Sequence, residues 1–288
     1  MRKTAIFAAT ALSAVFLGLT GVANATATPP ATAPVAASAS DGVDVRIVER
    51  GNGITKITSL EPSAQGAAAL AASLRAGDDS AWRGIEASTR VAVREGSATV
   101  VVVDDTATLN ATVTAAVVPP TACNWGTART LACPPPRWSN NGYSNPRISY
   151  YDRSGIPWPQ GSAVTKWNTS TYIDLYYTTS GCPTTTGYHC VPVSSGNFGP
   201  NGWIGLTSSV WYDATLYFVD GQNTIKYNDY YSVPGDPNLS TACHESGHAL
   251  GLDHNTSSGS CLYSTRVANR STTPNADDFG IIANIIYK

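Results

Sequence analysis

The stretch ACHESGHALGLDHN, Ala242–Asn255, determines the local fold and the expected chemistry of this 288-residue chain. His244 and His248 are four residues apart, so on a helix both imidazoles lie on one face, one turn apart. Gly251 follows three residues later and can adopt the positive φ that ends a helix sharply. The chain can then turn back and present His254. The spacing predicts a helix, a glycine turn and three histidines around one metal ion.

Glu245 directly follows the first histidine, where it can reach a metal-bound water rather than the metal itself. Three protein ligands leave one coordination position open, which distinguishes catalytic from structural zinc. Three of the four histidines of the chain lie in this stretch, and Glu245 is the only glutamate after Glu95. We therefore predict one catalytic Zn²⁺ held by His244, His248 and His254. Glu245 would activate the zinc-bound water and then protonate the leaving group.

The N-terminus has the pattern of an export signal. Arg2 and Lys3 precede an apolar run at 5–22, and Ala-Asn-Ala at 23–25 fits a cleavage site. Residues 1–25 are predicted to be a signal peptide, which makes the protein secreted and extracellular, with no membrane partner after cleavage. The alternative is a membrane anchor, but the run is short and no charged stop follows it. The net charge of −2 and the lack of a basic run argue against a nucleic-acid partner.

Cysteine usage agrees with export, since an even number of cysteines in an exported chain favours disulfides. No C-x-x-C is present, which argues against a thiolate zinc site. Six cysteines allow fifteen pairings. Short loops favour the pairs Cys123 with Cys133, Cys182 with Cys190, and Cys243 with Cys261.

Composition divides the chain into segments. Residues 26–42 read as a flexible spacer. Residues 43–120 lack Tyr, Phe, His and Cys and contain valine-rich runs, which predicts a small α+β domain with an aliphatic core. Residues 121–144 form a linker that contains the Cys123/Cys133 loop. All fourteen tyrosines lie at or beyond Tyr143, and residues 145–288 are predicted to be the metal-binding domain.

Residue patterns indicate a sheet followed by a helical site, which is an α+β arrangement. Asn238 or Ser240 is expected to cap a helix through Cys243 to about Leu250. Further helices are expected near 64–75 and over 277–287, and residues 162–168 are expected to be the end of a short helix. Valine-rich runs lie at 43–48, 91–93 and 99–103, and strands are expected at Arg147–Tyr151, Ile173–Tyr177, Trp203–Leu206 and Thr215–Val219.

The complete motif H-E-x-x-H-x-x-G-x-x-H resembles the zinc signature of the metzincin endopeptidases. The run from His248 to His254 is most similar to the matrixin branch. The bacterial snapalysin-like secreted proteases are also similar, but they have Asp where this chain has His254, so Asp253 is given only a supporting or surface role. The resemblance implies a metzincin-like (zincin) fold with a twisted mixed sheet, an active-site helix and a C-terminal helix. It also implies a preceding pro-region and secreted zinc endopeptidase activity toward proteins or peptides.

The matrixin resemblance extends to the C-terminal segment, where Asp277 and Asp278 match a carboxylate pair in the last helix. In that family these carboxylates can anchor a new N-terminus after activation. The alternative is simple stabilisation at a helix N-terminus. By the same resemblance, the strand at 215–219 would pair with an extended peptide, and Ser264–Asn269 would shape a substrate pocket.

The chain departs from the family at the turn under the metal, where metzincins have a methionine. The only methionine here is Met1, and Leu262 lies eight residues after His254, in the Met-turn position. Leucine and methionine have similar volumes, so the swap should cost less than about 1.5 kcal/mol. A Cys243–Cys261 bridge would tie this turn to the helix.

The matrixin mechanism of latency is also missing, because residues 1–122 contain no cysteine to block the zinc. If the chain is a zymogen, residues 43–120 must block the cleft sterically or through another ligand. Asp104 and Asp105 are candidates for that ligand. A folding helper or a spacer is the alternative role of this region.

Two rival functions stay open on the residues alone: a zinc hydrolase of a non-peptide amide, and a non-catalytic secreted binding module stabilised by metal. A structural site would usually be closed by a fourth ligand. A monomer is expected. Calcium is left open at the aspartates, which match no EF-hand spacing, and His189 is expected to be a surface or packed histidine. The aspartates concerned are Asp213, Asp220, Asp229 and Asp236.

Overall fold

The computed structural model describes residues 43–104, 120–155, 157–264 and 270–288. The predicted signal peptide and spacer therefore lie outside the described residues. No described helix has the length and apolarity to cross a lipid bilayer.

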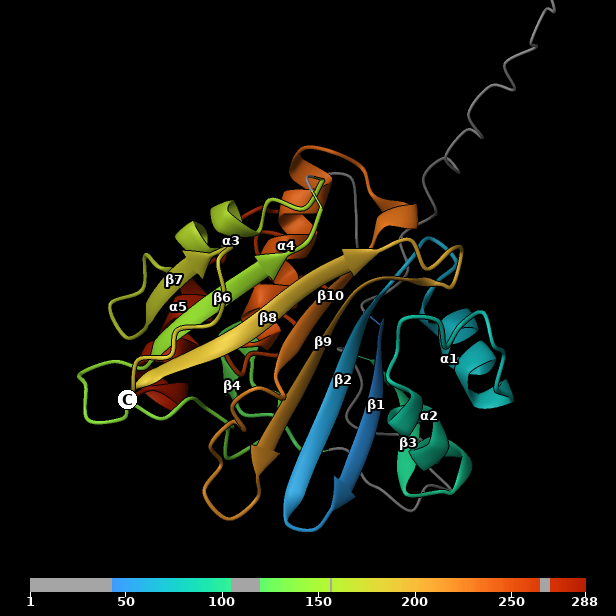
Figure 1. Ribbon diagram of the computed structural model, residues 1–288, viewed down its shortest axis with the longest axis horizontal. Helices are drawn as coiled ribbons and strands as arrows, with labels where there is room; N and C mark the ends of the chain where they lie inside the picture. Colours follow the sequence, from blue (N-terminus) through green and yellow to red (C-terminus); the bar gives the residue numbers. More distant parts are fainter. Residues whose placement is uncertain (1–42, 105–119, 156, 265–269) are drawn as a thin grey trace, which may run out of the picture. The chain divides into compact units, whose positions relative to one another are not determined.

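The described residues form one large mixed sheet with the strand order β3-β1-β2-β9-β10-β8-β6-β7 (Figure 1). Neighbouring strands run parallel from β10 through β8 and β6 to β7, whereas β9, β2, β1 and β3 pair antiparallel. The strands are β1 Val43–Gly51, β2 Ile54–Pro62, β3 Ala98–Asp104, β6 Arg147–Arg153, β7 Asp174–Thr178, β8 Tyr188–Gly196, β9 Trp203–Tyr212 and β10 Thr224–Asn228. A separate two-stranded sheet joins β4 Asn124–Trp125 to β5 Ala128–Arg129.

The N-terminal part of the sheet starts from a tight hairpin. Asn52 and Gly53 connect β1 and β2, and both have positive φ (54° and 72°). Asn-Gly is the preferred pair for a two-residue turn that follows the right-handed twist of the strands. The helices α1 Ala67–Ala76 and α2 Ala87–Arg94 lie beside these strands (Figure 1). Leu70 and Leu74 of α1 are buried in a cluster with Leu60 and with Trp203 of β9.

The second core lies among the parallel strands and the remaining helices. It contains Trp138, Trp167 and Ile225, together with Leu262 and the apolar side of the C-terminal helix. The helices are α3 Gln160–Trp167, α4 Asp236–His248 and α5 Ala276–Ile281, with a 3-10 turn at Asp229–Tyr231 and a π-helical turn at Ile282–Ile286. The mixed sheet and these helices confirm the predicted α+β fold class.

Two expectations about elements were wrong. Thr215–Val219 is not a strand of the sheet: its Tyr217 and Phe218 form only isolated bridges to Arg137 and Trp211. Helix α4 begins at Asp236 after Gly235, with Pro237 in its first turn, so neither Asn238 nor Ser240 is its cap. Proline is well suited to the first helical turn because that turn has no intrahelical use for its missing N–H.

The disulfides join Cys123 to Cys133, Cys182 to Cys190, and Cys243 to Cys261, which confirms the preferred pairing. The last of these connects α4 to the segment after the glycine turn. The metal-binding motif and the Leu262 turn are therefore linked covalently as well as by packing.

Candidate metal centre

Helix α4 carries the first two histidines and ends at the second. Gly251, with φ of +99°, follows the helix, and its N–H donates to the carbonyl of His248 (3.0 Å). A Cβ built on Gly251 would lie 2.6 Å from the carbonyl oxygen of Pro136. Both the backbone angle and the space therefore require glycine here. The turn brings His254 back against the helix, as the sequence predicts.

The three histidines converge through their Nε2 atoms. Nε2 of His244 lies 3.1 Å from Nε2 of His248 and 3.1 Å from Nε2 of His254. Nδ1 of His244 donates to the carbonyl of Cys261, and Nδ1 of His248 to that of Leu252, both at 2.9 Å. These two imidazoles therefore point the lone pair of Nε2 toward the common centre. Within the described residues, this triad is the group of His, Cys, Asp or Glu with metal-binding geometry.

This donor set fits a zinc ion. Tetrahedral zinc with nitrogen ligands at about 2.0–2.1 Å places those nitrogens roughly 3.3 Å apart, close to the separations here. Converging lone pairs repel one another, and a bound cation removes that repulsion. Zinc also requires neutral imidazole. Burial lowers the pKa of His254 to about 3 and lowers the pKa of His244 well below its ordinary value.

Glu245 lies between α4 and β9, fully buried. The hydroxyl of Thr207 on β9 donates to Oε2 of Glu245 (2.6 Å) and is also 3.0 Å from its backbone carbonyl. A Cβ built on Gly205 would lie 2.5 Å from Oε1 of Glu245. Strand β9 therefore positions the carboxylate in two ways. The Thr207 hydroxyl binds it, and Gly205 leaves the space that it occupies.

Two buried ion pairs flank the triad. Arg46 of β1 contacts Asp253, and both side chains are 3% exposed. Burial alone would raise the pKa of Asp253, but Arg46 holds that pKa below its ordinary value. Arg270 lies 2.7 Å from Glu61 of β2, and its Nη1 is 3.5 Å from Nδ1 of His244. Asp253 therefore has a buried partner rather than a surface position.

Leu262 occupies the turn that follows His254 and is fully buried. A Cβ built on Gly247 of α4 would lie 2.8 Å from Leu262 Cδ2, so this side chain packs directly against the helix that carries the histidines. The backbone N–H of Asn255, next to His254, donates to the carbonyl of Leu262 (2.9 Å).

The carboxylate pair of the last helix has two separate partners. Asn275 and Asp278 form a capping box at the start of α5, and buried Asp278 also accepts from Asn255 (2.8 Å) and Ser260 (2.5 Å). Half-buried Asp277 accepts from the backbone N–H and the hydroxyl of Thr127. The last helix thus supports the segment that follows the third histidine and the turn between β4 and β5.

The other predicted residues lie away from the triad. His189 is buried, and its ring nitrogens contact Asp220 (2.9 Å) and the carbonyl of Ser139 (2.7 Å). Asp213 accepts from Thr55, and Asp229 accepts from the indole of Trp158 (2.7 Å). Asp104 is the last residue of β3, at the edge of the sheet. Asp105 and residues 265–269 of the expected pocket segment lie outside the described residues.

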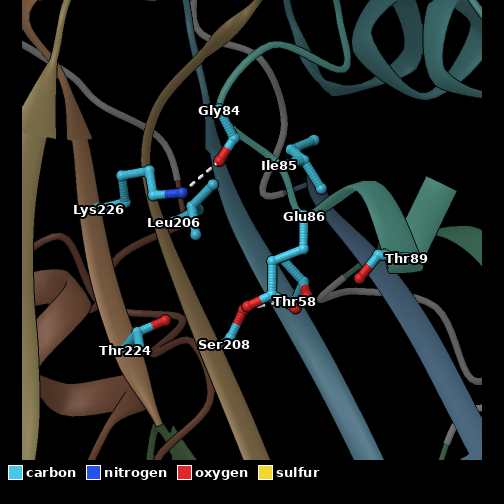
Figure 2. Close-up of a pocket in the computed structure, with 9 residues that line it drawn as sticks. All are labelled: Thr58, Gly84, Ile85, Glu86, Thr89, Leu206, Ser208, Thr224 and Lys226. Atoms are coloured by element: carbon cyan, nitrogen blue, oxygen red, sulfur yellow. Dashed lines mark hydrogen bonds between the residues drawn. The ribbon is translucent and has the colours of Figure 1, made fainter. Parts of the chain in front are cut away.

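A small pocket lies on the face of the sheet away from α4. Lys226 of β10 donates to the carbonyl of Gly84 at 2.5 Å, and Thr58 of β2 contacts Ser208 of β9 at 3.3 Å (Figure 2). Thr207 and Ser209, which alternate with Ser208, have hydrogen bonds to α4. This pocket therefore belongs to the packing of the segment before α2 against the sheet, and not to the histidine site.

Sequence reasoning missed the roles of Thr207 and Glu61, and also the contact of Arg270 with Glu61. None of the three lies in the motif, and strand pairing or chain return brings each to it. One signal in the sequence could have pointed to Glu61: glutamate is rare in this chain, which has only five.

Three converging imidazoles on a helix and a glycine turn, with a carboxylate on the same helix, have the arrangement of a metzincin-type metal centre. The family model described as Matrixin matches residues 202–287, which include β9, α4 and the C-terminal helix. This part of the chain is therefore similar to the matrixins. A comparison with curated proteins gives no match.

Proposed function

We propose that the chain is a secreted zinc-dependent endopeptidase. The convergence of three Nε2 atoms next to a buried glutamate carries this proposal. The matrixin match to residues 202–287 supports it. The three disulfides fit an oxidising, extracellular environment.

His244, His248 and His254 would hold the metal. A bound zinc ion would supply a Lewis acid that polarises the scissile carbonyl and lowers the pKa of a water molecule. Glu245 would accept the proton of the attacking water and return it to the leaving amine. The hydroxyl of Thr207 stabilises the ionised carboxylate and fixes its position, since hydrogen bonds to charged groups are the stronger ones.

The peptide would pair with β9 rather than with the segment at 215–219. Strand β9 contacts α4 through Thr207 and Ser209, and its other edge faces away from β10. An extended peptide added to a sheet edge gains backbone hydrogen bonds and is presented as a straight chain. That arrangement would place a scissile bond beside Glu245.

The decisive experiment measures casein or gelatin cleavage by the secreted protein, together with its zinc content. The wild type, Glu245→Ala and Glu95→Ala should be compared, with and without a chelator. We expect Glu245→Ala to retain zinc and lose hydrolysis, because the ligands remain and the base is gone. The exposed Glu95 provides the matched control and should be silent.

Unchanged hydrolysis in Glu245→Ala would sink this mechanism. Loss of zinc without loss of hydrolysis on chelation would contradict a metal-dependent reaction. N-terminal sequencing of the secreted form should accompany the assay, because it locates the maturation site.

A further inference from the structure

Strand β2 occupies the edge of β9 at which a peptide would pair. Residues Ile54–Pro62 run antiparallel to Tyr212–Trp203, and the register changes between Glu61 and Pro62. A bulge at this point is a common way to end pairing or redirect a side chain. The same segment thus lies in an extended, substrate-like conformation along the strand that positions Glu245.

The register places Glu61 at the proposed active site. Glu61 pairs with Gly205, the residue that packs against the carboxylate of Glu245. Glu61, Glu245 and His244 are 0–1% exposed, so in this chain the N-terminal strands close the site to solvent. An external peptide cannot reach the triad while β2 is in place.

A buried ion pair holds Glu61 there. Its Oε1 lies 2.7 Å from Nη2 of Arg270, and both side chains are at most 1% exposed. Apart from this contact, no described group donates a hydrogen bond to either oxygen of Glu61. The charge of Arg270 therefore compensates the burial of this carboxylate, because a buried charge is costly without a partner.

Arg270 is itself fixed by the metal-binding segment. Its Nε donates to Ser240 (2.6 Å) at the start of α4, and its Nη1 donates to the carbonyl of Tyr263 (3.3 Å). The guanidinium is therefore held in place beside His244, and its Nη2 faces the carboxylate of Glu61. On the other side of the triad, Arg46 of β1 contacts Asp253 and provides a second attachment of the N-terminal strands.

We propose that β2 is an internal occupant of the peptide-binding edge, and that Arg270 selects an acidic side chain in the peptide that replaces it. This inference rests on the proposed function. Residues 43–104 keep the site closed until β2 leaves β9. Departure of Glu61 removes the partner of Arg270, and a glutamate or aspartate in an extended substrate, opposite Gly205, restores it.

The occupancy is tested on the full-length, zinc-loaded protein. Zinc release to a chromogenic chelator and deuterium uptake by β9 are compared in the wild type, Glu61→Gln and Glu86→Gln. Glu86 belongs to the same region but forms an exposed ion pair with Lys56, so its variant is the matched control. We expect Glu61→Gln to release zinc at least tenfold faster and to expose β9 amides, with β6 and β7 unchanged and Glu61→Asp partly restored.

Selectivity is tested by chemical rescue of Glu61→Ala. Acetate should slow its zinc release toward the wild-type rate, whereas acetamide, a neutral molecule of the same shape, should not. Equal effects of the two molecules, or no effect of either, would overturn selection of an acidic group. Wild-type zinc release and β9 exchange in Glu61→Gln would overturn the occupancy.

These measurements do not depend on hydrolysis, so they separate this inference from the proposed function. If the protein shows both effects but cleaves no substrate, the occupancy of the β9 edge by β2 stands and the proposed endopeptidase activity is contradicted. If hydrolysis requires Glu245 but zinc release is unaltered in Glu61→Gln, the endopeptidase proposal stands and the occupancy of the β9 edge by β2 is contradicted. Uniform exchange across β6, β7 and β9 in Glu61→Gln would indicate general unfolding and would also count against a local gate.

Discussion

Leu262 lies where metzincins have a methionine, and its side chain fills the space against Gly247 of α4. Its carbonyl also receives the N–H of Asn255, so the backbone of the turn supports the third histidine independently of the side chain. The residue acts through packing volume and turn conformation, and neither property is unique to methionine.

We therefore expect Leu262→Met to leave hydrolysis within severalfold of the wild type. A swap that conserves volume in a core typically costs less than about 1.5 kcal/mol. Kinetics on a peptide substrate and a thermal melt provide the check. A large loss of activity at unchanged melting temperature would mean that the turn affects the site through more than packing.

Thr207 acts through one hydroxyl. In Thr207→Val the shape is kept but the hydrogen bond to Oε2 of Glu245 is lost. A hydrogen bond to a charged group contributes about 1.5–3 kcal/mol, so we expect kcat to fall roughly 10- to 100-fold with zinc retained. Thr207→Ser keeps the hydroxyl and should stay near the wild-type rate. Equal rates for the valine and serine variants would contradict this role.

Strand β8 carries His189, a buried titratable residue that is not part of the histidine triad. Burial lowers the pKa of His189, but hydrogen bonds to Asp220 and Ser139 outweigh it and raise the pKa above 6.5. A raised folded-state pKa means that the protonated ring stabilises the fold. That stabilisation is complete below the unfolded pKa and is lost as the pH rises through the folded pKa.

The matched variant is Asp220→Asn, which removes the charge and keeps the shape. We expect the melting temperature of the wild type to exceed that of the variant by more at pH 6 than at pH 9. A direct titration of His189 by NMR would complement the melts. A difference that is constant over this range would exclude the imidazolium–carboxylate contact as its source.

Short-range patterns predicted the elements well where one turn or one face carries the information. The histidine spacing in Ala242–Asn255 predicted the end of α4 and the return of the third ligand, and the apolar spacing predicted the C-terminal helix. Alternation alone was insufficient at Thr215–Val219, because a strand also needs a partner with free backbone groups. The strand beside α4 is instead β9, an interior strand between β2 and β10 that extends to Tyr212, beyond the predicted end at Leu206.

At the scale of the whole molecule, Arg46 and Asp253 connect β1 to the turn that carries His254. Removing one partner of a buried ion pair typically costs about 3–5 kcal/mol, because the other charge remains buried. We expect Arg46→Met and Asp253→Leu each to destabilise by roughly that amount, and the double variant to recover a large part of the loss. Denaturant unfolding of all four proteins gives this cycle, and strictly additive losses would contradict the coupling.

The sequence alone could not predict that the N-terminal strands β1–β3 join the same sheet as β9. The change in composition near residue 120 indicated a separate domain, and that boundary stays a prediction. Composition does not predict the pairing of β2 with β9. This pairing joins residues that are far apart in the chain, such as Ile57 and Ser209. Glu61 looks like an ordinary surface glutamate in sequence and becomes informative only through this register.

The pairing of β2 with β9 also bears on solubility. Once β1–β3 depart, β9 exposes a row of unpaired N–H and C=O groups along Trp203–Tyr212. A free strand edge is a template for aggregation as well as for binding, because it pairs with any extended chain, including another copy of itself. While β2 is paired with β9, it covers these backbone groups and keeps other chains from pairing with them. Under this proposal, a form without β1–β3 would self-associate unless it were dilute or bound to a peptide.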